Sequence, residues 1–145
     1  MCHEIEEVKR YIIRTLRKHG FAVQLYQAHT SNSVYIKVDY GLCNTIRISD
    51  HKGKHNLAYR FNLRKDVKER YADRSKRYVQ YMYPLSDKRL VIDEILFMRK
   101  KKIAKNGVAW YLNELRTQKQ SNRNNKGFWE KCQLVCDYDV LSIGK

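Results

Sequence analysis

The chain has 145 residues, and its 30 Lys and Arg residues against 15 Asp and Glu residues give a formal net charge of +15. Hydrophobic residues make up 43% of the chain, which excludes a wholly disordered protein, and the single proline and six glycines exclude collagen-like and proline-rich classes. A sequence pI near 9.8 indicates an anionic partner, with nucleic acid as the first choice and acidic proteins or membranes as the alternatives.

Residues 3–19 are predicted to form an amphipathic helix. Its apolar side chains recur three and four residues apart along one face, at Ile5, Val8, Ile12 and Leu16. Acids lie in the first turn and bases near the last turn, which suits the charges at the two ends of a helix dipole. Gly20 follows as the expected C-terminal cap.

Strands are predicted next, because apolar side chains alternate with other residues at a period of two. The segments with this pattern are 21–25, 34–40, 46–48 and 57–63. Their connections are short and rich in turn-forming residues, which favours an antiparallel meander. Residues 78–83, which end at Pro84, are a candidate further strand.

The C-terminal part is predicted to be mainly helical. Ser86 and Asp87 offer an N-cap for a long helix that runs to about residue 105 and stops at Asn106-Gly107. A second helix covers about 108–119, and residues 120–127 contain no apolar side chain and are interpreted as a polar linker. The apolar tail that follows either docks back on the domain or binds a partner.

The order of a helix, then strands, then helices predicts an α+β fold. We expect an N-terminal helix on an antiparallel sheet of about four to five strands, followed by a helical C-terminal part. Residues 1–85 would hold the helix and the sheet, residues 86–119 a helical part of the same domain, and residues 120–145 the polar linker and apolar tail.

Basic and aromatic side chains interleave in the middle of the chain, where residues 64–105 hold 14 bases against 6 acids. Cations neutralise phosphates while tyrosine rings stack on unpaired bases, so the pattern favours nucleic-acid binding, with a solvated surface as the alternative. The predicted nucleic-acid or partner-binding residues of the first run are Arg64, Lys65, Lys68, Arg70, Tyr71, Arg74, Lys76 and Arg77. Those of the second run are Arg99, Lys100, Lys101 and Lys102, which also suit a helix C-terminus.

No catalytic or metal-binding residue is predicted. Cys132 and Cys136 lack the second Cys/His pair of a zinc site, and no third group is evident to orient a Cys43–His51 nucleophile pair. A nuclease needs clustered carboxylates, and nothing in their spacing requires such a cluster among Asp39, Asp50, Asp93 and Glu94. We therefore expect no cofactor and no enzymatic activity.

A stretch in the first half of the chain has a distinctive pattern, in which SVYIKVDYG, from Ser33 to Gly41, is followed by IRISDH, from Ile46 to His51. A strand with S-x-Y, a short turn and then I-R-I-S-D-H resembles small phage and mobile-element proteins of low-GC Gram-positive bacteria, among them type II-A anti-CRISPR proteins. The resemblance covers about 20 to 30 residues of the 145.

The I-R-I-S-D-H element also has a structural interpretation. Alternation points Ile46 and Ile48 toward the core and Arg47 outward. Arg47 would then pair with Asp39 across the hairpin, as oppositely charged residues on neighbouring strands do.

The resemblance implies an inhibitor that acts by binding a type II CRISPR effector nuclease, its guide RNA or its target DNA. A chain with a net charge of +15 cannot imitate DNA, so it would block ribonucleoprotein assembly or hold a nuclease domain away from its substrate. The alternative is a nucleic-acid-binding accessory or regulatory protein of a phage or plasmid, and a small nuclease is the third choice.

The same features predict a location in the cytoplasm of a bacterial host cell. The N-terminus carries early acids and no apolar segment after them, which argues against a secretory signal. Four scattered cysteines are too few for a disulfide scaffold, and no apolar run approaches the roughly 20 residues of a membrane span. We expect no membrane partner, and the sequence leaves the oligomeric state open.

Overall fold

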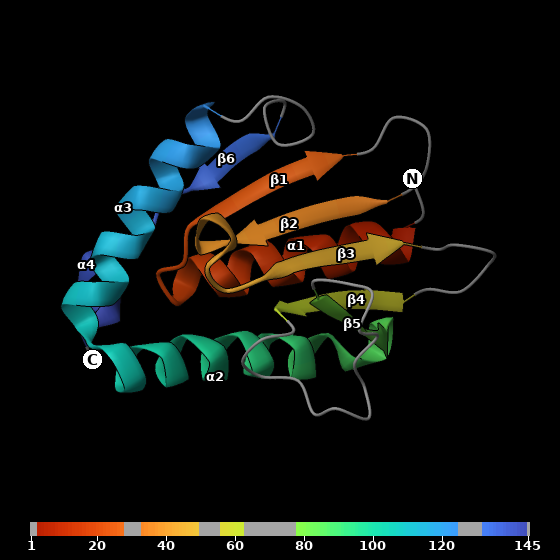
Figure 1. Ribbon diagram of the computed structural model, residues 1–145. Coiled ribbons are helices and arrows are strands. Elements are labelled where there is room, and N and C mark those ends of the chain that lie inside the picture. The colour runs from red at the N-terminus through yellow and green to blue at the C-terminus, as the bar shows by residue number, and fades with distance from the viewer. Residues whose placement is uncertain (1–2, 28–32, 50–55, 63–77, 125–131, 145) are drawn as a thin grey trace.

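The structure of the protein is a computed structural model that describes residues 3–27, 33–49, 56–62, 78–124 and 132–144 (Figure 1). The helices in these ranges are α1 (His3–Lys18), α2 (Lys88–Asn106), α3 (Val108–Asn124) and α4 (Val140–Ile143). The strands are β1 (Val23–Gln27), β2 (Val34–Val38), β3 (Thr45–Ser49), β4 (Asn56–Asn62), β5 (Tyr78–Pro84) and β6 (Gln133–Cys136). Single turns of 3-10 helix lie at Asp39–Gly41 and Leu85–Asp87.

The strands of the described part form one antiparallel sheet in the order β5-β4-β3-β2-β1-β6. β1 to β5 follow one another as a meander, so the predicted α+β fold and antiparallel sheet are confirmed. The expected four to five strands fall short of the six observed, because β6 comes from the C-terminal tail and pairs with β1. The tail therefore docks on the domain.

The N-terminal helix α1 forms because one apolar face of it packs into the core, as its periodicity predicts. The predicted stripe of Ile5, Val8, Ile12 and Leu16 is buried. Gly20 ends the helix with a left-handed φ of +79°, and its N–H donates to the Arg17 carbonyl at 3.0 Å. The next N–H, of Phe21, donates to the Leu16 carbonyl at 3.1 Å, which completes a Schellman cap and turns the chain into β1.

One hydrophobic core joins the sheet to all four helices. The fully buried side chains of β2 and β3 are Val34, Ile36, Val38, Ile46 and Ile48. Figure 1 shows α1 behind the sheet, α2 along the side where β4 and β5 lie, and α3 beside the strand ends. Tyr111 and Leu115 of α3 and Ile143 of α4 belong to the same core, so the helical part and the tail are parts of one packed unit.

The C-terminal helices differ from the prediction in their ends. α3 runs to Asn124, so residues 120–124 are helical and are not a linker, while residues 125–127 lie outside the described residues. Residues 120–124 are polar but contain no proline or glycine, and a helical turn at the surface needs no apolar side chain. Asp87 lies at the N-cap of α2 without a side-chain capping bond. None of the helices in the described ranges is long and apolar enough to cross a membrane.

Candidate nucleic-acid interface

Of the two predicted basic runs, the structure describes only the second. The whole first run, Arg64, Lys65, Lys68, Arg70, Tyr71, Arg74, Lys76 and Arg77, lies outside the described residues. The second run lies on α2, where consecutive side chains point about 100° apart around the axis. Arg99 is turned inward and only 5% exposed, Lys100 and Lys101 are exposed, and Lys102 is half-buried. The run is therefore distributed around the helix and does not form one surface patch.

Arg99 connects α2 to the end of α1 and to the tail. Its Nε lies 3.1 Å from Asp39 Oδ2, in an ion pair that is not aligned as a hydrogen bond. Its Nη1 donates to the carbonyl of His19 at 3.4 Å and to Ser142 Oγ at 3.3 Å, and its Nη2 donates to the carbonyl of Gly20 at 3.2 Å. Arg99 is thus held inside the fold, contrary to its predicted place on an exposed basic surface.

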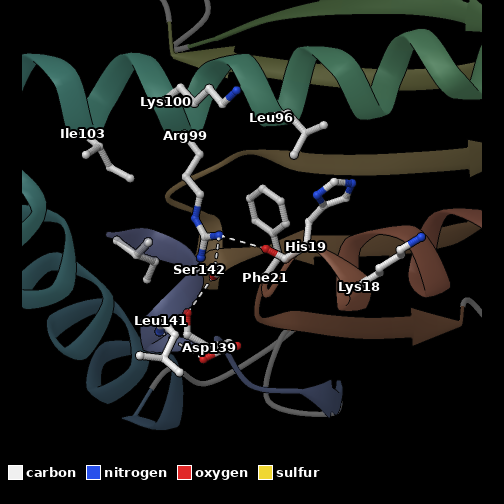
Figure 2. A pocket seen from close by; sticks show the side chains of 11 residues that line it. Lys18, His19, Phe21, Leu96, Arg99, Lys100, Ile103, Asp139, Leu141 and Ser142 are labelled. Atoms are coloured by element: carbon white, nitrogen blue, oxygen red, sulfur yellow. Dashed lines mark hydrogen bonds between the residues drawn. The ribbon is translucent and has the colours of Figure 1, made fainter. Parts of the chain in front are cut away.

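A cavity of about 590 Å³ opens beside Arg99, between α2, the end of α1 and α4 (Figure 2). Its wall combines the cations Lys18 and Lys100 with apolar side chains such as Leu96 and Leu141. Figure 2 shows Arg99 crossing the cavity toward the carbonyl of His19 and the hydroxyl of Ser142. The guanidinium in this cavity is therefore already engaged by the protein itself.

Asp39 is the buried counterion of Arg99. Its carboxylate accepts hydrogen bonds from the N–H of Ala22 at 2.9 Å and from the hydroxyl of Tyr111 at 2.5 Å. Burial raises the pKa of Asp39, while the Arg99 charge and these two donors act against that shift by stabilising the carboxylate. The cluster links α2, α3 and the residue just before β1 around one carboxyl group.

Cys43 belongs to the same buried region. Its Sγ lies 3.0 Å from the Tyr111 hydroxyl. Burial, followed by the nearby Asp39 carboxylate, raises the pKa of Cys43 to about 12, so the thiol stays protonated at neutral pH. A protonated thiol is a poor nucleophile, and His51, considered above as its base, lies outside the described residues.

The other chemical groups considered from the sequence do not converge where the structure describes them. No three His, Cys, Asp or Glu side chains of the described residues come close enough to hold a metal ion. Cys132 and Cys136 are half-buried reduced thiols beside and within β6. Asp93 is exposed and Glu94 half-buried on α2, Asp39 is fully buried, and Asp50 lies outside the described residues.

The outer face of the sheet carries aromatic and basic side chains. On β2, Tyr35 and Lys37 are half-buried and alternate with fully buried apolar residues. Strand pairing places Tyr26 of β1 opposite Tyr35, and Tyr35 opposite Arg47 of β3. A Tyr-Tyr-Arg row therefore crosses three neighbouring strands on the face opposite to the buried side chains of β2 and β3.

The Arg47 guanidinium joins the residues of this row. It donates to Ser33 Oγ from Nη2 at 3.2 Å and from Nε at 3.4 Å, and its Cζ lies 5.6 Å from the centroid of the Tyr35 ring. The Tyr26 and Tyr35 rings pack at a tilt of 52°, with centroids 6.2 Å apart. The predicted Arg47–Asp39 pair is wrong, because Asp39 turns into the core and Arg47 faces outward.

This arrangement suits contact with a single nucleic-acid strand. A guanidinium beside tyrosine rings offers a cation for phosphates and π faces for bases. Sheets that bind single-stranded RNA also present outward aromatic side chains to stack the bases. Lys37 adds a second cation to the face, and its burial lowers its pKa.

Tyr26 and Lys37 were not among the predicted binding residues. A signal for Lys37 was present, because alternation along 34–40 puts Tyr35 and Lys37 on the same face of a strand. Trp110 was also missed. It lies in a small cavity among three lysines that becomes recognisable only when α2 and α3 are placed together.

The fold and the site define an α+β protein whose outer sheet face combines tyrosines with basic side chains. No family model matches the chain, and neither a curated protein nor a solved structure matches it.

Proposed function

We propose that this protein inhibits a type II CRISPR effector nuclease by binding the effector, its guide RNA or its target DNA. It acts without chemistry of its own, in the cytoplasm of a bacterial host cell. The net charge of +15 supports an anionic partner such as the ribonucleoprotein.

The contacts of Arg47 carry the proposal. Ser33 and Tyr35 come from the S-x-Y half of the segment that resembles anti-CRISPR proteins, and Arg47 comes from the I-R-I-S-D-H half. Arg47 contacts each of the other two side chains, at 3.2 Å from Nη2 to Ser33 Oγ and at 5.6 Å from Cζ to the centroid of the Tyr35 ring. Tyr35 and Arg47, one from each half of the pattern, thus belong to a basic, aromatic surface that suits a nucleic-acid partner, and the buried Ser33 helps to hold Arg47 there.

The same surface supports a second candidate function, a nucleic-acid-binding accessory or regulatory protein of a phage or plasmid. Stacking on Tyr26 and Tyr35 needs no protein partner, because every unpaired base has a π face. This candidate predicts tight binding to naked RNA or DNA with a steep salt dependence.

A pull-down with a type II effector, with and without guide RNA and at two salt concentrations, tests both functions. Arg47→Ala and Tyr35→Ala should weaken binding and inhibition of DNA cleavage, whereas Arg14→Ala removes a comparable exposed charge from α1 and should have little effect. Effector binding that survives the higher salt supports the inhibitor. Binding only to naked nucleic acid supports the second candidate, and binding to neither overturns both.

A further inference from the structure

A second cavity, of about 220 Å³, lies where the last turn of α2 meets the first turns of α3. The residues that line it are Leu42, Lys101, Lys102, Lys105, Asn106, Trp110 and Glu114. Drug-sized ligands occupy cavities of roughly 300 to 1,000 Å³, so this smaller cavity has room for one ring system.

The walls of this cavity are held in place by the surrounding fold. Trp110 is half-buried and packs beside Tyr111, with ring centroids 6.4 Å apart. Lys102 Nζ donates to the carbonyl of Leu42 at 2.6 Å, which fixes a cation at the wall. Leu42 lies in a connection with left-handed backbone at three non-glycine residues, Asp39, Tyr40 and Asn44. Such costly conformations persist where surrounding contacts impose them, and they cluster at ligand sites.

The side-chain chemistry of the cavity discriminates between anionic ligands. Three lysines beside an indole ring suit a phosphate attached to a planar group. Glu114 also lines the cavity, and its carboxylate accepts hydrogen bonds from a ring edge that carries N–H groups. Guanine presents such an edge, with adjacent N1–H and N2–H₂ donors.

We propose that this cavity binds a single unpaired guanine nucleotide of a nucleic-acid strand. The base stacks on Trp110, Glu114 accepts from the guanine N–H edge, and Lys101, Lys102 and Lys105 hold the phosphate. This inference rests on the proposed function, because it supplies a base-selective site for the strand that contacts the outer sheet face.

Tryptophan fluorescence tests the site directly. The chain has two tryptophans, so Trp129→Phe leaves Trp110 as the only indole reporter. Guanosine 5′-monophosphate should quench this signal more strongly than cytidine 5′-monophosphate, and ribose 5-phosphate should not quench it. If Trp129→Phe does not fold, the indole N–H resonance of Trp110 in the unmodified chain, assigned by its loss in Trp110→Phe, gives the same readout.

Two variants and one control separate the contacts. Lys105→Glu should weaken guanosine monophosphate binding about tenfold or more, and Glu114→Gln should remove most of the preference for guanine over cytosine, a factor of about ten. Arg116→Glu makes the same charge change at an exposed position of α3 outside the cavity and should leave binding unchanged.

The inference is overturned if no nucleotide perturbs Trp110, if ribose 5-phosphate acts as well as the nucleotide, or if Arg116→Glu weakens binding as much as Lys105→Glu. Failure here is distinguishable from failure of the proposed function. If effector binding depends on Arg47 but no nucleotide changes the Trp110 signal, the base site is excluded and the proposed inhibitor function still stands.

Discussion

Replacing Arg99 by methionine should destabilise the protein strongly, because it leaves the Asp39 carboxylate buried without its counterion. Asp39 is fully buried, and the lost ion pair spans 3.1 Å between Arg99 Nε and Asp39 Oδ2. Removing one member of a buried ion pair costs about 3–5 kcal/mol. Since a domain is stable by only about 5–15 kcal/mol, the variant should lose roughly a fifth or more of its free energy of unfolding.

Double-variant measurements test this reasoning. In Arg99→Met/Asp39→Asn the buried group is neutral, and its side-chain oxygen still accepts from Tyr111 or Ala22. The double variant should therefore be more stable than Arg99→Met alone, by about 1–3 kcal/mol in urea unfolding followed by circular dichroism. Lys100→Met, at an exposed neighbouring position, should unfold like the parent chain.

The pH dependence gives an independent check on Arg99→Met. Without Arg99, burial dominates and the pKa of Asp39 in the folded variant lies far above its unfolded value. A carboxyl group whose pKa is higher in the folded state than in the unfolded state destabilises the fold. The loss of stability is complete above the folded-state pKa, and it disappears as the pH falls to the unfolded-state pKa. The difference in free energy of unfolding between the parent chain and Arg99→Met should thus shrink as the pH falls from about 7 to about 4. A loss below about 1 kcal/mol, or a deficit that does not change with pH, would refute the argument.

Three further predictions concern other parts of the molecule. Gly20→Ala should lower the melting temperature and loosen α4, because the added Cβ would lie 2.2 Å from Ser142 Oγ and the backbone at this position has a φ of +79°. A wild-type melting temperature would contradict this. Because burial raises the pKa of Cys43 from 9.0 to about 12, stability should fall by up to about 1.4 kcal/mol per pH unit above about pH 9, and Cys43→Ala should remove that slope in alkaline unfolding experiments. If Arg47 contacts a phosphate, Arg47→Ala should lower the slope of log affinity against log salt for single-stranded RNA by about one, and an unchanged slope would exclude that contact.

The features that sequence could predict are those that depend on local periodicity. The spacing of Ile5, Val8, Ile12 and Leu16 fixes one helix face, and that face is buried. Alternation along β2 and β3 likewise identifies the buried side chains, including Ile46 and Ile48. Gly20 was recognisable as a cap because only a glycine adopts the required backbone at little cost.

The features that sequence did not predict depend on partners far apart in the chain. Asp39 and Arg99 are separated along the chain by the strands β3, β4 and β5, and no local pattern links them. The end of α3 was missed because a polar helical turn and a polar linker have the same composition. On α2, a run of four consecutive bases suggested a patch, but the helical period sends Arg99 into the core.

The pairing of β6 with β1 has a consequence for how the chain is made. Arg17 Nη2 donates to the Val135 carbonyl at 3.1 Å across a separation of 118 residues. At a ribosomal rate of about 5–20 residues per second, β6 is synthesised roughly 6 to 24 seconds after the end of α1. For that time the backbone groups of one edge of β1 have no β6 to pair with, so a nascent chain offers a strand edge that other chains can join. β6 covers this edge of β1 late, and a slowly translated 3′ half of the message would prolong the interval in which nascent chains can associate.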